Sequence, residues 1–368
     1  MDISRRLTNA LSPITKKAHG IFFTPTCDVK FLVDSLMNFA QFETVLEPSC
    51  GSCEFVRYMD DRMTGLDIDC YEINETIYEE IVKLRFNNNV TIKHSNYLQE
   101  KTKRYDLVIG NPPYTCHIYF IKKALQSLTE GGHMLFVLPC NFLSSKSCDP
   151  IRRDIVENYT IKMVHIFDQS QYFETNQETC AIIVQNTHPM SNEHVSIRLS
   201  DRVVLNSENR CDKLRSLAIG SKTLTELGFK VSVGTVLWNT NKHLLTSNDE
   251  YTRLIYSSDI VNNKLSIQRY SNRTKLNFIK REGLDKRCIV VNRGYGSSKY
   301  DFRYALIIHD NYLIENHLLV VTHDDDQMTS KLYDCLGDTR TIEFISTYCQ
   351  NNAMTVSELG SIVPIFIA

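Results

Sequence analysis

Short apolar, β-branched runs alternate with amphipathic stretches along the first half of the 368-residue chain. Residues 26–40 show the helical pattern, because their apolar side chains recur on one face. We predict strands at seven places: residues 43–47, 64–72, 89–94, 105–110, 133–139, 161–167 and 180–185. Strands and helices in alternation predict an α/β fold with a mainly parallel sheet covered on both faces.

The segments that follow three of these strands carry the candidate chemistry, since ligands of such sheets bind beyond the carboxyl ends of the strands. The first strand runs into EPSCGSCEF, residues 47–55, whose small residues let the backbone approach a ligand closely. Glu72 ends the second strand, where a carboxylate can accept hydrogen bonds from ribose hydroxyls. The fourth strand stops at NPPY, residues 111–114, because proline has no N–H to give to a ladder.

Charge is distributed unevenly over the second half of the chain. The net charge of the whole sequence is −2, so binding to nucleic acid requires a local patch. Residues 264–303 carry a net charge of +8, and residues 304–368 carry −7. Aromatic residues interleave with the basic ones and favour a nucleic-acid face over a merely solvated surface. They are Tyr270, Tyr295, Tyr300 and Phe302.

Cysteine usage and hydropathy indicate a soluble intracellular protein. Twelve scattered cysteines fit a reducing compartment better than a disulfide framework. Residues 1–20 are mixed and charged, and no apolar run is long enough to span a membrane. Cys50 and Cys53 have CxxC spacing, but no second CxxC or HxxxH follows, so we expect buried thiols and no metal.

Taken in order, the motifs resemble those of the gamma-class DNA adenine-N6 methyltransferases. HGIFFTP (19–25), LEPSCGSCEF (46–55), YEIN (71–74), HSNYL (94–98) and IGNPPY (109–114) resemble motifs X, I, II, III and IV of that family. GGHMLFVLP (131–139) resembles its fifth strand, and YFETNQETCAIIV (172–184) resembles motif VIII. Residues 228–245 and 351–366 resemble, more loosely, the two ends of its target-recognition domain.

The resemblance implies a Rossmann-like, seven-stranded catalytic domain in residues 1–205 and a C-terminal α+β DNA-recognition domain in residues 220–368. It also implies S-adenosyl-L-methionine as cofactor and S-adenosyl-L-homocysteine as product. Thr24, Pro25 and the strand-end turn would lie near its methionine part, Glu72 at its ribose, and Ile73 and Tyr97 at its adenine. The implied cofactor-binding residues are Thr24, Pro25, Glu47, Pro48, Cys50, Gly51, Glu72, Ile73, Asn96, Tyr97 and Asn111.

Two positions depart from the family pattern. Asn96 stands where motif III usually has an acid, and its amide oxygen can accept the same hydrogen bond from the cofactor's amino group. Cys53 stands where motif I has its last glycine, and we expect its side chain to crowd the cofactor.

The implied chemistry is transfer of a methyl group to the amino nitrogen of adenine. The side-chain oxygen of Asn111 and the carbonyl of Pro112 would accept the two N–H bonds and free the nitrogen lone pair. Tyr114 and Phe173 would stack on the two faces of a base extruded from the duplex.

The expected partner is double-stranded DNA, read at a short palindromic site by a monomer. In NRGYGSSKYDFR, residues 292–303, we expect Arg293 to make a base-edge or groove contact, Lys299 to touch the DNA backbone, and Tyr295 to pack on a sugar or base. No nuclease pattern is evident, so any cleavage belongs to a separate restriction endonuclease, and the protein acts in cytoplasm or nucleus, wherever its DNA lies.

Two other functions use the same residues differently. Protein-glutamine and RNA methyltransferases share NPPY, but their substrate-binding part usually precedes the catalytic domain, whereas residues 206–368 follow it here. A non-catalytic DNA-binding module is the third reading. Intact Asn111, Pro112, Pro113, Tyr114 and Glu72 count against it.

Overall fold

The computed structural model describes residues 24–167, 178–189, 191–270, 275–294, 300–308, 310–349 and 353–367. The chain divides into an N-terminal unit, Met1–Cys211, and a C-terminal unit, Asp212–Ala368. Each unit has hydrophobic cores of its own. In the described ranges no helix is both long and apolar enough to cross a bilayer.

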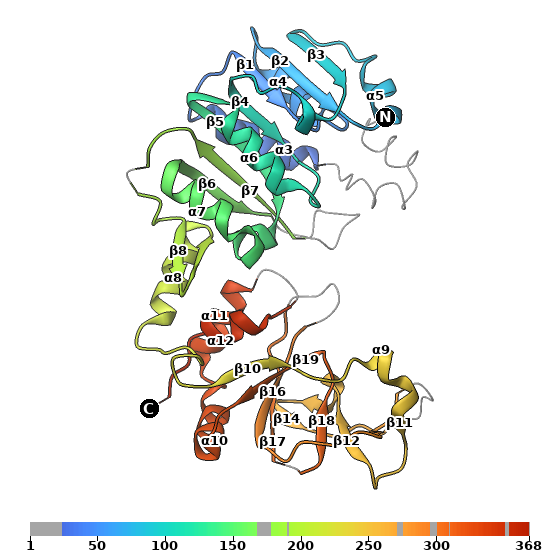
Figure 1. Ribbon diagram of the computed structural model, residues 1–368. Coiled ribbons are helices and arrows are strands. Elements are labelled where there is room, and N and C mark those ends of the chain that lie inside the picture. Colours follow the sequence, from blue (N-terminus) through green and yellow to red (C-terminus); the bar gives the residue numbers. More distant parts are fainter. Residues whose placement is uncertain are drawn as a thin grey trace. The chain divides into compact units, whose positions relative to one another are not determined.

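A single mixed sheet organises the N-terminal unit (Figure 1). Its strands, within the described residues, are β1 (Thr44–Glu47), β2 (Asp67–Glu72), β3 (Asn89–His94), β4 (Tyr105–Gly110), β5 (Leu128–Pro139), β6 (Thr160–Ile166) and β7 (Thr179–Gln185). They lie in the order β3-β2-β1-β4-β5-β7-β6. All neighbours pair in parallel except β7, which is antiparallel to both β5 and β6.

Helices cover both faces of this sheet. They are α3 (Thr26–Met37), α4 (Glu54–Arg62), α5 (Glu75–Ile81), α6 (His117–Gln126) and α7 (Asp149–Asn158). The core on one face joins side chains of α3, α4 and α5, and the core on the other joins those of α6 and α7. Successive strand residues point to opposite faces, so Leu46 enters one core and Val45 the other.

The sequence-based α/β prediction is confirmed, and the differences lie at element ends. The helix predicted in residues 26–40 is α3, which buries Val29, Leu32, Val33 and Leu36. β5 begins at Leu128, earlier than the predicted residue 133. Its Gly132 passes so close to the neighbouring strand that a Cβ there would lie 3.0 Å from the Tyr105 carbonyl oxygen. Both glycines, Gly131 and Gly132, are part of the strand.

Beyond β7 the N-terminal unit adds a hairpin of β8 (Ser196–Leu199) and β9 (Arg202–Leu205). Arg152 in α7 is fully buried and donates to the carbonyls of Phe142 at 2.7 Å and Val203 at 2.6 Å. These bonds tie the hairpin to the segment that follows β5. Helix α8 (Glu208–Ala218) then leads into the C-terminal unit.

The C-terminal unit is an α+β structure built on short strands. One sheet has the order β10-β19-β16-β17, with β10 (Lys230–Val233), β16 (Cys288–Asn292), β17 (Tyr304–Ile307) and β19 (Leu318–Thr322). A second has the order β11-β15-β12-β18, with β11 (Leu245–Thr246), β12 (Thr252–Ile255), β15 (Phe278–Ile279) and β18 (Tyr312–Ile314). The remaining elements are α9 (Trp238–Asn241), β13 (Ile260–Val261), β14 (Lys264–Leu265), α10 (Asp326–Cys335), α11 (Thr339–Tyr348) and α12 (Val356–Ser361).

Candidate active site

The segments after β1, β2 and β4 meet at one edge of the sheet, because these three strands are parallel neighbours. The turn after β1 is fixed by its own backbone. The N–H of Cys50 donates to the carbonyl of Tyr71 at 2.9 Å, and the N–H of Cys53 donates to that of Cys50 at 2.7 Å. Gly51 and Cys53 both have left-handed backbone, with φ of 51° and 59°. The family's glycine at the position of Cys53 is explained by this conformation.

The side chain of Cys53 does not lie where we expected it. It is fully buried in the core below α3 and α4, beside Cys50 and Cys70. The prediction that it crowds the cofactor is therefore wrong, because the left-handed backbone turns the thiol inward. Burial raises the pKa of the Cys70 thiol to about 11, although a hydrogen bond from Cys50 lowers it. The described residues contain no group of three or more His, Cys, Asp or Glu side chains arranged to hold a metal ion.

Glu72 connects the end of β2 to this turn. One carboxylate oxygen accepts from the N–H of Gly51 at 3.0 Å, and the other accepts from the N–H of Asn74 at 2.7 Å. Burial raises the pKa of Glu72, and the two amides oppose that shift. Each oxygen keeps a lone pair, so the carboxylate can still accept hydrogen bonds from a diol.

Glu47, at the end of β1, is a buried carboxyl group whose charge is not compensated. The residue is 2% exposed, and its Oε2 accepts no hydrogen bond from any described residue. Burial, with the negative charges of Glu54 and Glu72, raises the pKa of Glu47 well above its usual range. A cationic ligand would reverse this shift and pair with the orphaned oxygen. The methionine part of S-adenosyl-L-methionine carries such an ammonium group, so the residues present fit that cofactor.

Ile73 comes directly after β2, and Asn96 lies shortly after β3. Ile73 follows Glu72 and is 58% exposed, so its apolar side chain is open at the strand ends. Asn96 uses its side-chain oxygen to accept from the N–H of Leu98 at 3.0 Å, which starts a short 3-10 helix, Tyr97–Gln99. That oxygen retains one lone pair for a second donor.

Tyr97 is turned away from the strand ends. Its hydroxyl lies 3.1 Å from that of Ser127, which directly precedes β5 at the opposite edge of the sheet. Its ring packs against Tyr71 and Phe120, and burial raises the pKa of its hydroxyl to about 12. The ring therefore joins the core, and its contact with the cofactor stays a prediction.

Asn111 brings motifs X, I and IV together. Its side-chain Nδ2 donates to the Thr24 hydroxyl at 3.1 Å, which fixes the orientation of the amide. Thr24 precedes Pro25, whose carbonyl accepts from the first N–H groups of α3. The Ser49 hydroxyl, in the turn after β1, donates to the Asn111 carbonyl at 3.4 Å.

Backbone carbonyls of the NPPY loop are held one by one. The Pro113 carbonyl accepts from the N–H of Cys116 at 3.1 Å, and the Tyr114 carbonyl lies 2.5 Å from Nδ1 of His117. No described residue donates to the carbonyl of Pro112. Pro112 thus presents an unused acceptor in a loop that is otherwise fixed.

Tyr114 is half-buried beside Asn111. Burial raises the pKa of its hydroxyl, and a hydrogen bond with the Asn111 side chain opposes the shift. The loop thus gathers a hydrogen-bonding amide, a backbone acceptor and an aromatic ring. Phe173, Tyr295 and Lys299 lie outside the described residues.

In the C-terminal unit, Arg293 follows β16 and is partly exposed. Its guanidinium donates to the Asn316 carbonyl at 3.1 Å, and Gly294 beside it has a φ of 81°. Of the four aromatic residues that we expected on a nucleic-acid face, Tyr270, Tyr300 and Phe302 are partly buried against the cores of this unit, and Tyr295 lies outside the described residues. Tyr300 donates to the Asn292 carbonyl at 2.7 Å, Phe302 packs on Tyr304, and Tyr270 packs on Tyr256.

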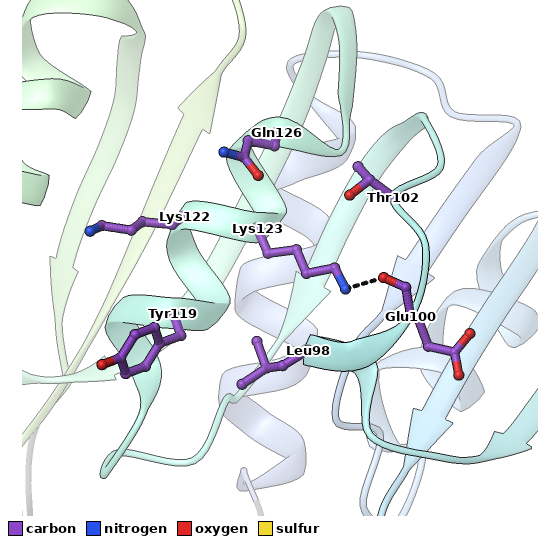
Figure 2. Close-up of a pocket in the computed structure, with 7 residues that line it drawn as sticks. All are labelled: Leu98, Glu100, Thr102, Tyr119, Lys122, Lys123 and Gln126. Carbon is purple, nitrogen blue, oxygen red and sulfur yellow. Dashed lines mark hydrogen bonds between the residues drawn. The ribbon is translucent and has the colours of Figure 1, made fainter.

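A pocket of about 420 Å³ lies along the outer side of α6, as Figure 2 shows. It is lined by Leu98, Tyr119 and neighbouring polar side chains, and by none of the predicted site residues. The ammonium group of Lys123 donates to the carbonyls of Tyr97 and Glu100, both at 2.5 Å. Lys123 therefore holds the segment between β3 and β4 in place. The pocket is separate from the site at the strand ends.

Comparisons with known proteins agree with this geometry. Residues 14–161 match the model of the methyltransferase small domain family. The type II methyltransferase M.CvrRI of Paramecium bursaria Chlorella virus XZ-6E is 23% identical over 399 residues, covering 99% of this chain and 98% of that protein. The modification methylase CviBIII of Paramecium bursaria Chlorella virus NC1A is 24% identical over 379 residues, covering 95% of this chain and 94% of that protein. A solved class I S-adenosylmethionine-dependent methyltransferase from Listeria monocytogenes aligns with a TM-score of 0.42 at 16% identity, over 56% of this chain and 72% of that one.

The strand order, with β7 antiparallel between β5 and β6, defines the Rossmann-like fold of class I methyltransferases. The matched domain and the relatives support a methyltransferase enzyme with S-adenosyl-L-methionine as its cofactor. His117 is the functional candidate that sequence reasoning missed. Its only sequence signal is a histidine three residues after Tyr114, at the start of a helix.

Proposed function

We propose that the protein is a site-specific DNA methyltransferase that acts on N6 of adenine in duplex DNA. The carrying observation is the NPPY loop, in which Asn111 is oriented by Thr24 while the Pro112 carbonyl has no donor among the described residues. Two acceptors at the end of a rigid strand suit a planar amino group with two N–H bonds. The two viral relatives, named as a type II methyltransferase and a modification methylase, align over nearly the whole chain, including its C-terminal unit.

Cofactor contacts follow from the two buried carboxylates. Glu47 would pair with the ammonium group of the methionine part, and Glu72 would accept from the ribose hydroxyls. Ile73 would cover one face of the adenine. When bound, S-adenosyl-L-methionine supplies a methyl group on a sulfonium, which is already a good leaving group.

Asn111 and Pro112 would act on the acceptor. Asn111 and Pro112 would accept hydrogen bonds from the two N–H groups of the target amino group. These bonds draw the target nitrogen toward tetrahedral geometry and free its lone pair for attack on the methyl carbon. The C–S bond breaks with its electron pair going to sulfur, and the amino group then loses a proton to water. Because the adenine amino group is stacked and paired in a duplex, the base must be extruded first. Tyr114 would stack on one face of the extruded base and Phe173 on the other. Such stacking stabilises the bound base by on the order of 1–3 kcal/mol.

The C-terminal unit would supply target recognition, with Arg293 at a base edge or groove, Lys299 at the DNA backbone and Tyr295 on a sugar or base. The protein then acts as a monomer at a short palindrome, in whichever compartment holds its DNA, and any cleavage belongs to a separate restriction endonuclease. Sequencing of DNA incubated with the protein and S-adenosyl-L-methionine tests this. Methylated adenine should map to one short site, and scattered or absent adenine methylation would contradict the proposal.

Base extrusion has its own test. 2-Aminopurine at the target position should brighten on binding, because the base leaves the stack. Tyr114→Ala should reduce this signal together with turnover. An unchanged signal in that variant would remove Tyr114 from the base-binding role.

A further inference from the structure

His117 lies directly behind the NPPY loop, in the first turn of α6. It is 9% exposed, and its Nδ1 lies 2.5 Å from the Tyr114 carbonyl oxygen. A carbonyl oxygen only accepts hydrogen bonds, so Nδ1 must carry a proton and donate. The peptide plane that follows Tyr114 is therefore held by a side chain and not by helix geometry alone.

The other ring nitrogen is held as well. Nε2 of His117 lies 3.7 Å from Sγ of Cys148, which ends a short 3-10 helix, Lys146–Cys148, in the segment after β5. Phe142 meets the ring edge-on, with centroids 6.1 Å apart. Burial lowers the pKa of His117, but the contacts with Cys148 and the Tyr114 carbonyl outweigh it and raise the pKa overall. Nδ1 keeps its proton in the neutral and in the charged ring, so the bond to Tyr114 persists in both.

We propose that His117, backed by Cys148, is a positioning residue for methyl transfer. By fixing the carbonyl of Tyr114 it sets the angle at which the Tyr114 ring and the neighbouring Pro112 acceptor meet the base. This inference rests on the proposed function of the NPPY loop. A displacement of about 1 Å at a reacting group can reduce the rate about a hundredfold, so a contact at this distance has leverage on turnover.

Two histidine variants separate positioning from stability. His117→Ala should lower kcat by about tenfold or more while the Kd for S-adenosyl-L-methionine stays unchanged, because the two carboxylates proposed to hold the cofactor, Glu47 and Glu72, lie at the ends of β1 and β2. His133→Ala is the matched control: His133 is also buried, in β5, and its ring packs on Phe42. We expect that control to lower the melting temperature without a selective loss of kcat.

Amide variants supply the rescue. Asparagine places its amide nitrogen where Nδ1 lies, and glutamine places it where Nε2 lies, so only His117→Asn can still donate to the Tyr114 carbonyl. His117→Asn should recover most of the wild-type kcat, and His117→Gln should not. This pair decides the matter even when His117→Ala does not fold.

Turnover of duplex DNA by the wild-type protein distinguishes failure of the positioning role from failure of the proposed function. An active wild type with equal kcat in the Asn and Gln variants would overturn the positioning role alone. Losses of kcat that track the melting temperature equally in His117→Ala and His133→Ala would do the same. A wild type that methylates no adenine in duplex DNA would overturn the proposed function and this inference with it.

Discussion

The loops after β1 and β4 follow neighbouring strands, yet they are held by opposite means. The β1 loop begins at Glu47 and is held by Glu72, and burial raises the pKa values of both carboxyl groups. The β4 loop is held by hydrogen bonds that involve no carboxylate, since Thr24, Ser49 and His117 each contact one of its groups.

The difference shows what each loop is built to do. Uncompensated buried charge destabilises the unliganded protein and becomes favourable only when a cationic ligand arrives. The hydrogen bonds to the β4 loop keep its geometry, and the Pro112 carbonyl stays available as an acceptor. We therefore propose that the β1 side of the edge captures the cofactor and that the β4 side aligns the methyl acceptor, and the following changes test that division.

Asn111→Ala should have the largest effect. It removes a preorganised acceptor, so kcat should fall by at least about a hundredfold while DNA and cofactor affinities persist. Asn192→Ala is a matched control, because Asn192 is a buried asparagine that donates to Val156 and Tyr159 away from the loop. Single-turnover rates with saturating DNA measure the effect of each variant. A comparable loss of rate in Asn192→Ala would contradict a specific role of Asn111 in the loop after β4.

Glu47→Gln should weaken S-adenosyl-L-methionine binding by roughly 10- to 100-fold, the range for loss of a hydrogen bond to a charged group. Glu43→Gln, an exposed glutamate just before β1, should leave the affinity unchanged. Titration calorimetry compares them. Equal affinities for wild type and Glu47→Gln would place the ammonium contact elsewhere.

Without ligand, Glu47→Gln should be more stable than the wild type, and this difference in stability should grow as pH rises. The folded pKa of Glu47 is raised, so its contribution to stability is complete below the unfolded pKa of about 4.3 and is lost as pH rises through the folded value. Glutamine cannot ionise. The melting temperature of Glu47→Gln should therefore exceed that of the wild type more at about pH 8 than at about pH 5. A gap that narrows with pH would contradict the assignment.

Arg293→Ala tests whether DNA recognition is separate from both loops. It should weaken binding to the correct site by roughly 1–3 kcal/mol and relax sequence choice, with cofactor affinity unchanged. Arg340→Ala is the control, since Arg340 pairs with Asp338 within the acidic last segment. Identical methylation maps and affinities for both variants would move the recognition surface away from β16.

Cys53→Gly should have the smallest effect. Glycine relieves a left-handed backbone that costs other residues roughly 1–2 kcal/mol, while the lost buried thiol offsets part of that gain. Because the thiol faces the core, the Kd for S-adenosyl-L-methionine should stay within about threefold, well under 1.4 kcal/mol. A marked gain in affinity would revive the idea that Cys53 crowds the cofactor.

The sequence predicted which candidate residues lie at the carboxyl ends of the strands. Glu47, Glu72 and Asn111 were predictable because period-2 runs locate the strands and parallel strands share a carboxyl edge. Tyr97 was not, because the chain turns back toward β4 within the short helix that Asn96 begins, and this reversal leaves no periodic signal. Tyr300 and Phe302 pack against a core of the C-terminal unit, and their alternation with basic residues in the sequence does not reveal that packing.

His117 marks the limit of the approach. A histidine near a motif is equally compatible with packing, catalysis or metal binding until its two nitrogens are placed, and only the structure shows one at Tyr114 and the other at Cys148.

Nucleoside analysis of DNA methylated with labelled S-adenosyl-L-methionine tests the central assignment most directly. The wild-type protein should transfer label to duplex DNA, and digestion should release it as N6-methyladenine. Parallel reactions with RNA and with a glutamine-containing peptide should remain unlabelled. Label on cytosine, on RNA or on the peptide, with none on adenine of duplex DNA, would contradict the account.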